Sequence, residues 1–364
     1  MPISQVPFAG ISNPVDFRNI VINGDMQIAQ RSTSVASITT GAYYTLDRWN
    51  TVLSSLGTWT MSQSTDVPTG QGFATSLKYD CTTADASPAA SDNFRVQQLF
   101  EGQNLQYLKK GTANALPLTL SFWVKSTKTG TFIAEIFDTD NTRQVSKSYT
   151  VSVSNTWEFK TITFPADTTG TLTNDNGVSL SVTFWLGAGS DFTSGTLNTS
   201  WAASTNANRA VGQVNIGDST SNDWYITGVQ LEAGEQASGF EFMPIDTNLE
   251  RCQRYCYVFT EASTATDGII GAGFSVNGVG GAFFIIYFPT VMRASPTSTF
   301  TTASHFEKLK FGVGWADATA IDLWHSQRYL FIIEITSGQT DTSGLGTFLR
   351  IEDASGKITL SSEL

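Results

Sequence analysis

Residues 180–189 read LSVTFWLGAG, and this stretch decides the fold class. Apolar residues stand at every second position from Leu180 to Leu186, and Trp185 occupies one of the alternate positions. Because successive side chains of a β-strand point to opposite faces, this period of two predicts a strand with one face in a core. Other stretches rich in β-branched and aromatic residues lie at 118–126, 130–138, 157–164 and 223–232.

Turn-forming residues, rather than helices, separate these predicted strands. The sequence Asn-Asp-Asn-Gly at 174–177 stands directly before the strand that includes Leu180, and Asn-Gly favours a tight turn. Helical periodicity is almost absent from this part of the chain, whereas parallel strands need long crossover connections that are usually helical. The pattern therefore predicts an antiparallel jelly-roll sandwich over residues 20–245.

One helix is predicted after Pro244. Thr247 and Glu250 have the spacing of a capping box, and apolar residues continue at intervals of three and four from Leu249 to Phe259. We expect a helix over about residues 247–257, within a connecting segment at 246–259. This segment marks a boundary between the sandwich and the rest of the chain.

The two ends of the chain differ in character. Residues 260–364 are again rich in strand patterns and predict a smaller C-terminal β-sandwich domain. Residues 1–19 contain Pro2, Pro7 and Pro14 without periodicity, which predicts an extended N-terminal arm suited to attachment.

Composition excludes several classes of function. The chain has 364 residues, a net charge of −11 and only 15% charged residues, so it lacks the excess of Lys and Arg from which nucleic-acid binding draws its affinity. We find no apolar run of about 18 residues that would predict a membrane span, and no secretion signal at the N-terminus. With three cysteines, a disulfide framework is not expected, and synthesis in a reducing cytoplasm fits the sequence.

Several motifs resemble those of tailed-bacteriophage tail fibre and appendage proteins. Residues 19–31 read NIVINGDMQIAQR and residues 44–49 read YTLDRW, similar to the pattern INGDF.IAQRG followed by Y..DRW in that group. Residues 225–234 read YITGVQLEAG, followed by FEFMP at 240–244 and LERCQRY at 249–255, which resembles TGVQLE.G, FE.RP and EL..CQRYY. Cys256 stands where the group has a second aromatic residue, and Met26 replaces Phe.

The resemblance extends almost to the end of the chain. Residues 289–297, PTVMRASPT, resemble the MRA.PT segment of the same group, and the final SEL is similar to its usual ending. It implies a virion structural protein with a jelly roll like that of carbohydrate-binding modules. It also implies that the C-terminal domain, residues 260–364, is a candidate for the distal, receptor-facing end. The implied partners are further copies in a homotrimer, other tail or capsid proteins at the N-terminal arm, and a glycan of the host surface, with adsorption as the function.

Three tryptophans are predicted as glycan-binding residues, because an exposed indole can stack on a sugar ring. Trp185 lies opposite the apolar face of its strand, Trp201 stands in the polar stretch NTSWAAST, and Trp324 precedes His325 in the C-terminal unit. For each of them, simple packing in a core is the alternative.

Two further sets of residues are weaker candidates. Asp25 and Asp223 lie near the first and last strands of the predicted sandwich, where similar carbohydrate-binding modules often hold a structural calcium; hydrogen bonding at turns and strand ends is the alternative. We expect no other cofactor. Arg251 and Arg254 flank the apolar stripe of the predicted helix, where they could pair with a neighbouring subunit or face water.

No enzymatic constellation is found in the sequence. It lacks a G-x-S-x-G motif, and neither of its two histidines stands beside a nucleophile motif. We therefore expect a protein that is not an enzyme. Two alternatives stay open: a tail enzyme that cleaves polysaccharide, which would need two carboxylates facing each other across a cleft, and a capsid-decorating or connector fibre without a ligand.

Overall fold

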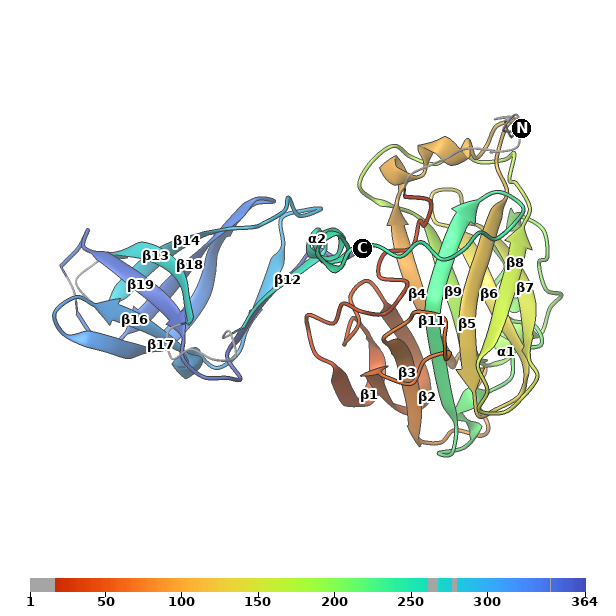
Figure 1. The fold of residues 1–364 in the computed structure, drawn as a ribbon, viewed down its shortest axis with the longest axis horizontal. Helices are drawn as coiled ribbons and strands as arrows, with labels where there is room; N and C mark the ends of the chain where they lie inside the picture. The colour runs from red at the N-terminus through yellow and green to blue at the C-terminus, as the bar shows by residue number, and fades with distance from the viewer. Residues whose placement is uncertain (1–16, 261–267, 277–279, 341) are drawn as a thin grey trace, which may run out of the picture.

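The computed structural model describes residues 17–260, 268–276, 280–340 and 342–364. Within these ranges the chain is built mainly from antiparallel strands, which confirms the all-β prediction. Figure 1 shows a large sandwich on the right, a smaller β unit on the left and helix α2 between them. None of the helices in the described ranges is long and apolar enough to cross a membrane.

The sandwich is one sheet of 11 strands that folds over on itself, in the order β10-β7-β6-β9-β4-β2-β3-β11-β5-β8 with β1 beside β2. The strands are β1 (Ser34–Ala42), β2 (Asn50–Ser64), β3 (Ser76–Thr83), β4 (Asn93–Glu101), β5 (Leu118–Ser126), β6 (Gly130–Asp138), β7 (Arg143–Val151), β8 (Glu158–Phe164), β9 (Val178–Ala188), β10 (Ala202–Ala203) and β11 (Asp223–Ala233). The predicted strands thus correspond to β5, β6, β8, β9 and β11.

Strand β2 belongs to both layers of the sandwich. Its residues 50–54 pair with β4, and its residues 58–64 pair with β3. Between these segments, Ser55 and Gly57 have φ angles of 53° and 74°, in the left-handed region that breaks a regular strand. A Cβ atom on Gly57 would lie 2.6 Å from the carbonyl oxygen of Thr83. The chain therefore passes from one layer to the other within a single strand.

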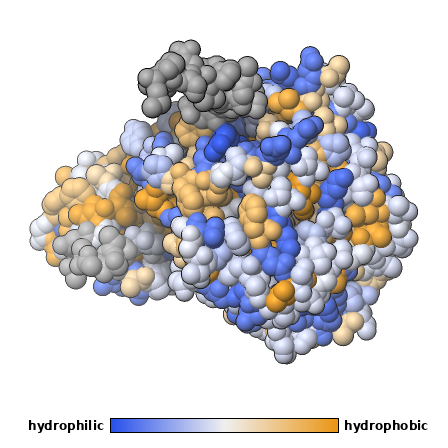
Figure 2. Space-filling view, turned by 45° about the vertical axis from the view of Figure 1, so that its right-hand side comes forward, coloured by the Kyte–Doolittle hydropathy of each residue, from blue (hydrophilic) through white to orange (hydrophobic). Residues whose placement is uncertain are grey.

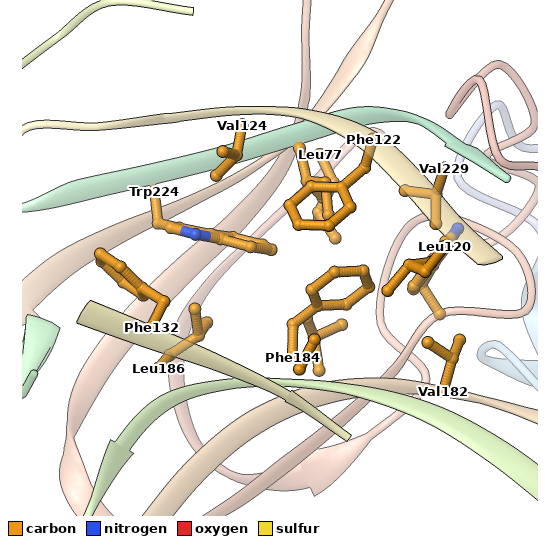
Figure 3. Close-up of a cluster of buried hydrophobic side chains, with 14 of the residues drawn as sticks. Leu77, Leu120, Phe122, Val124, Phe132, Val182, Phe184, Leu186, Trp224 and Val229 are labelled. Carbon is orange, nitrogen blue, oxygen red and sulfur yellow. The ribbon is translucent and has the colours of Figure 1, made fainter. Parts of the chain in front are cut away.

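The core lies between the two layers and is dominated by aromatic rings (Figure 3). Phe122 and Trp224, from the layer of β5 and β11, point toward Phe132 and Phe184, from the layer of β6 and β9. The ring centroids of Phe122 and Phe184 are 5.0 Å apart at an interplanar angle of 76°, an edge-to-face geometry favoured by aromatic pairs. The alternation predicted around Leu180 is thus the pattern that fills this core.

The C-terminal unit contains a closed barrel, β13-β14-β18-β17-β16-β19, and a three-stranded sheet, β12-β20-β15. Closure leaves the barrel without the unpaired edges of an open sheet. The two sheets share a core, because Ile358 and Leu360 of β20 pack in the same cluster as Phe284 and Phe331 of the barrel. The strands are β12 (Cys256–Thr260), β13 (Gly268–Val276), β14 (Gly281–Tyr287), β15 (Thr297–Phe300), β16 (Phe306–Lys310), β17 (Gly314–Ser326), β18 (Leu330–Ser337), β19 (Gly346–Ile351) and β20 (Lys357–Ser361).

Helix α2 (Ile245–Gln253) begins and ends earlier than the sequence predicts. Its N-cap is Pro244, and no side chain caps it, so the predicted capping box of Thr247 and Glu250 lies inside the helix. The apolar residues from Cys256 to Phe259 belong to strand β12, which pairs with β20. Over so short a segment, the spacing of apolar residues does not distinguish one continuous helix from a helix followed by a strand.

The predicted N-terminal arm comprises residues 1–19. Residues 1–16 of this arm lie outside the described residues. Where the description begins, the backbone N–H groups of Phe17 and Asn19 donate hydrogen bonds to the carboxylate of Glu241, at 3.1 and 2.8 Å. The chain thus joins the sandwich beside the segment that leads into α2.

The residues of the appendage-protein motifs meet at the junction between the sandwich, α2 and the C-terminus. Asn23 of the first motif donates from Nδ2 to the carbonyl oxygens of Ile28 and Asp47, at 2.8 and 3.0 Å. Arg48 of the DRW motif is 1% exposed and forms an ion pair with Glu363, at the other end of the chain. These buried polar contacts show that the motifs shape a structural junction.

Candidate functional site

The outer face of strands β3, β11, β5 and β8 carries a group of aromatic side chains. Each strand sends alternate side chains into the core, as Trp224 and Ile226 do from β11. The residues between them point the other way, so Tyr225 of β11 and Trp123 of β5 lie on the outer face. Trp157, just before β8, and Phe159, at its start, join them from the edge of the sheet.

The four rings form two pairs on this face. The centroids of Trp123 and Phe159 are 5.3 Å apart, and those of Trp157 and Tyr225 are 6.1 Å apart. Phe159 is 49% exposed, and both tryptophans are partly exposed. In the strand register, Trp123 stands opposite Phe159 and Thr227, and Tyr225 stands one outward position further along β11. The two pairs are therefore offset by about 7 Å along the strands, two residues of rise.

Charged side chains hold the second ring pair in place. Nζ of Lys125 lies 4.1 Å from the centroid of Tyr225 and forms an ion pair with Asp66. The indole N–H of Trp157 donates to Oδ1 of Asp66 at 2.9 Å. Although burial opposes it, the hydrogen bonds from Lys125 and Trp157 lower the pKa of Asp66. The carboxylate thus stays charged at neutral pH and fixes the edge of the Trp157 ring.

A second charged group borders the rings at the end of β11. Asp223 stands opposite Asp80 of β3 in the register, and Nζ of Lys78 lies 3.4 Å from Asp223 and 3.7 Å from Asp80. Burial, together with the hydrogen bond and negative charge of Asp80, raises the pKa of Asp223 to about 6. Lys78 therefore balances the charge of the two carboxylates, and Asp223 takes up a proton as the pH falls through about 6.

The structure does not bring the two calcium candidates together. Asp25 lies in the junction, where it accepts hydrogen bonds from Asn248 at 3.0 Å and from Gln27 at 2.8 Å. Asp223 lies on the outer face, paired with Lys78. Among the residues that the structure describes, no three His, Cys, Asp or Glu side chains form a group able to hold a metal. Both aspartates are thus occupied by hydrogen bonds or ion pairs within the chain.

The prediction for Trp185 is wrong as a surface platform, because this ring is fully buried. The segment after β9, with helix α1 (Ser190–Thr193), covers it, and the rings of Trp185 and Phe192 lie 5.3 Å apart. The indole N–H donates to Glu135 at 3.0 Å, and Arg209 also pairs with Glu135. Trp185 does lie opposite the core face of its strand, but a second layer of chain packs over that side.

Trp201 and Trp324 lie on different parts of the molecule. Trp201 is partly buried against the sandwich core, and its indole N–H donates to the carbonyl oxygen of Pro165 at 2.8 Å. Trp324 is 59% exposed on β17 of the barrel, and its ring centroid lies 5.1 Å from that of Phe283. The structure therefore leaves Trp324 accessible but does not place it near the rings of the sandwich face.

The two candidate interface arginines differ. Arg254 donates from Nε and Nη2 to the carboxylate of Glu101, at 2.8 and 2.7 Å. Its carboxylate partner is therefore in the same chain, whereas a contact with a neighbouring subunit stays a prediction. Among the described residues, Arg251 donates to the sulfur of Met243 at 3.1 Å and, weakly, to the carbonyl oxygen of Asn19 at 3.5 Å.

Sequence analysis named neither of the ring pairs on the outer face as a site. Trp123, Trp157, Phe159 and Tyr225 all stand in segments predicted as strands. The outward position of Trp123, between core residues Phe122 and Val124, could be read from the alternation. That the rings gather on one face, where Trp123, Trp157 and Phe159 keep exposed surface, depends on the pairing of β11 with β5 and of β5 with β8.

Comparison with known proteins finds no matching family model and no matching curated protein. Among solved structures, the chain is similar to the enzymatically active domain of bacteriophage CBA120 tailspike protein 4, with 17% identity and a TM-score of 0.31 over 60% of this chain. This chain spans only 22% of that structure's length.

Carbohydrate-binding modules are also among the similar structures. A family 11 module from Clostridium thermocellum, in complex with a mixed-linked tetrasaccharide, has 13% identity and a TM-score of 0.25 over 52% of this chain and 91% of that one. TmCBM61, in complex with beta-1,4-galactotriose, has 12% identity and a TM-score of 0.28 over 59% of this chain and 99% of that one. Such low identities and scores do not establish a relationship.

Proposed function

We propose that this protein is a virion appendage component that binds a glycan of the host surface through the outer face of β3, β11, β5 and β8. The observation that carries the proposal is the presence of two ring pairs, Trp123 with Phe159 and Trp157 with Tyr225, beside charged hydrogen-bonding groups. The assignment to a virion appendage is supported by the sequence motifs at 19–31, 44–49 and 225–255.

Glycan recognition on this face would combine stacking and hydrogen bonding. The apolar face of a sugar ring packs on an aromatic ring, while its hydroxyl groups need donors and acceptors at the rim. Phe159 and Trp157 supply exposed ring surface, and Asp66 is a charged acceptor next to Trp157. Each such contact is weak, but several copies on one particle convert weak contacts into strong attachment.

The homotrimer is part of the same proposal. The barrel exposes large apolar side chains, and the left side of Figure 2 shows hydrophobic surface over this unit. Extended exposed apolar surface on a soluble domain is typical of protein contacts. The residues concerned are Ile269, Phe274, Ile285, Tyr287 and Trp324. Other tail or capsid proteins, bound through the N-terminal arm, would complete the assembly.

A tail enzyme that cleaves polysaccharide is the alternative function, favoured by the carboxylates of Asp80 and Asp223. Nζ of Lys78 lies within 4 Å of both carboxylates. A lysine shared between two carboxylates is typical of a surface ion-pair cluster, whereas a glycosidase needs one carboxyl group as the acid and another as a free nucleophile. We therefore propose binding without cleavage. Release of reducing ends from a bacterial polysaccharide, abolished by Asp80→Asn and Asp223→Asn, would instead establish the enzyme.

The test is a bacterial glycan array probed with the wild-type protein, with Trp157→Ala and with Trp324→Ala, using Phe311→Ala as the matched control, because Phe311 is an exposed ring of the C-terminal unit outside the proposed contacts. We expect Trp157→Ala to weaken binding at least about tenfold, the loss of one stacking contact, while its unfolding free energy stays within about 1 kcal/mol of wild type. Unchanged binding by Trp157→Ala would contradict the proposed face. An equal loss in Trp324→Ala alone would move the site to the barrel.

A further inference from the structure

A cavity of about 300 Å³ opens at the junction, between the end of β4, the segment at 17–22 and helix α2. It is separate from the ring-bearing face of the sandwich. Its walls are largely apolar and include Ile20, Leu99, Phe100, Leu105 and Tyr107. A volume of this size accepts a small organic molecule rather than a few waters.

Two arginines of the junction line this cavity, and they differ in how their charge is balanced. Arg254 is neutralised by Glu101, which also accepts a hydrogen bond from the hydroxyl of Tyr255. Arg251, one turn away on α2, has no carboxylate within 4.0 Å among the described residues; its two acceptors are a thioether sulfur and a carbonyl oxygen at 3.5 Å. Burial is the main cause of a lowered pKa at Arg251.

Other arginines of the junction have acceptors for their guanidinium groups, either a carboxylate or, for Arg293, the backbone carbonyl oxygens of Ser362, Asn176 and Glu363 at 2.7–3.1 Å. Arg31 and Arg48 both reach the carboxylate of Glu363, and Arg31 also lies 3.9 Å from Asp47. A partly buried guanidinium without such a partner is costly, because water is removed without a replacement of equal strength. The cavity beside Arg251 is the space where a partner for this charge can bind.

We propose that this cavity binds an organic monocarboxylate with an apolar body. The planar guanidinium of Arg251 matches a carboxylate with two parallel hydrogen bonds, and the apolar walls fit a short hydrocarbon or aromatic group. Among the described residues Arg251 forms no ion pair, and Glu241 acts on it only from a longer distance, so a ligand with a single negative charge suits it. A phosphate dianion is disfavoured because Arg254 is already paired with Glu101, which leaves the guanidinium of Arg251 to balance one negative charge.

The experiment uses the full chain and isothermal titration with 3-phenylpropionate, its neutral amide 3-phenylpropionamide, and glucuronate. We expect the acid to bind, and the amide to bind at least about tenfold more weakly, since a charge-assisted hydrogen bond is lost. Arg251→Gln should show the same loss for the acid, whereas Lys147→Gln, which removes one positive charge from β7, should bind as wild type does. Equal binding of acid and amide, or unchanged binding by Arg251→Gln, would overturn the proposal.

A second variant keeps the test decisive if Arg251→Gln does not fold. Tyr107 is 38% exposed and lines the cavity, so Tyr107→Ser should leave the fold intact and weaken binding of 3-phenylpropionate by removing part of the apolar wall. Retained binding by Tyr107→Ser would contradict an apolar pocket. Tighter binding of glucuronate than of 3-phenylpropionate would also contradict an apolar pocket, because the body of glucuronate is polar throughout.

Discussion

The two layers of the sandwich both carry outward tryptophans, and their surroundings differ. On the layer of β6 and β9, the segment from α1 to residue 215 packs over Trp185. Ala210 of this segment lies in one buried cluster with Trp185 and Ile133. On the layer of β11 and β5, Trp123 and Trp157 stay partly exposed beside Phe159. An alternating strand pattern thus identifies an outward ring, but a second layer of chain decides whether that ring can meet a ligand.

The polar groups around the rings differ in the same way. Glu135, beside Trp185, is fully buried and held by Arg209 at 2.8 Å. Asp66, beside Trp157, is about half exposed. A buried carboxylate with a fixed partner stabilises packing, whereas an exposed one can exchange water for the hydroxyl groups of a ligand. We make four predictions that test the difference between the covered face around Trp185 and the face that carries Trp123 and Trp157.

Trp185→Ala should have the largest effect on stability. Removing a fully buried ring leaves a cavity under the covering segment, and we expect a loss of about 3–5 kcal/mol in the free energy of unfolding. Urea denaturation followed by fluorescence measures it, with Trp201→Ala as the comparison. A loss below about 1 kcal/mol would show that the segment does not cover the ring in solution.

Arg209→Met should come next. It removes the guanidinium that forms two hydrogen bonds to Glu135, at 2.8 and 3.0 Å, and leaves a buried carboxylate without its main partner. We expect a loss of about 3 kcal/mol, again from urea denaturation. The matched change on the uncovered face, Lys125→Met, removes a partner from the half-exposed Asp66 and should cost less. The reverse order would contradict the comparison.

Asp223→Asn should change the pH dependence of stability. The pKa of Asp223 is raised from 3.8 to about 6 in the folded protein, so between these values the folded state binds more protons than the unfolded state. The contribution of Asp223 is therefore favourable at low pH and is lost as the pH rises through that window. Thermal unfolding from pH 3.5 to 7 should show a shallower decline in the variant. An identical slope in both proteins would rule out this titration.

Phe159→Ser should have the smallest effect on stability. The ring is 49% exposed at the start of an edge strand, so the free energy of unfolding should change by only about 0.5 kcal/mol. Its binding to the bacterial glycan array should nevertheless fall, because the ring pair with Trp123 is broken. Full retention of binding would restrict the proposed site to Trp157 and Tyr225.

Much of the fold could be predicted from local patterns. The alternation from Leu180 to Leu186 and the turn residues before it predicted strand β9, because a period of two is a property of the strand itself. Helix α2 was predicted with its end too late, since Cys256 to Phe259 fit both a helix and a strand. The choice of strand is made by pairing with β20, more than 90 residues further on.

The candidate site was less accessible to prediction. Trp185 and Trp201 were selected by their places along the chain, yet one is covered by the segment after β9 and the other donates its N–H to Pro165. The rings that remain accessible come from two segments, around Trp123 and around Trp157 and Phe159, whereas Tyr225 is only 7% exposed. Their proximity follows from strand order, which no single segment encodes.

The sequence by itself determined that this protein is all-β, because alternation and turn chemistry are local properties of the chain. It also determined the motif residues Asn23 and Arg48, although not their buried structural role. Only the tertiary structure decided which face of the sandwich is covered and that Arg251 has no carboxylate within 4.0 Å among the described residues. Both depend on contacts between distant segments, and the physical reason is that burial and charge compensation arise only when those segments pack together.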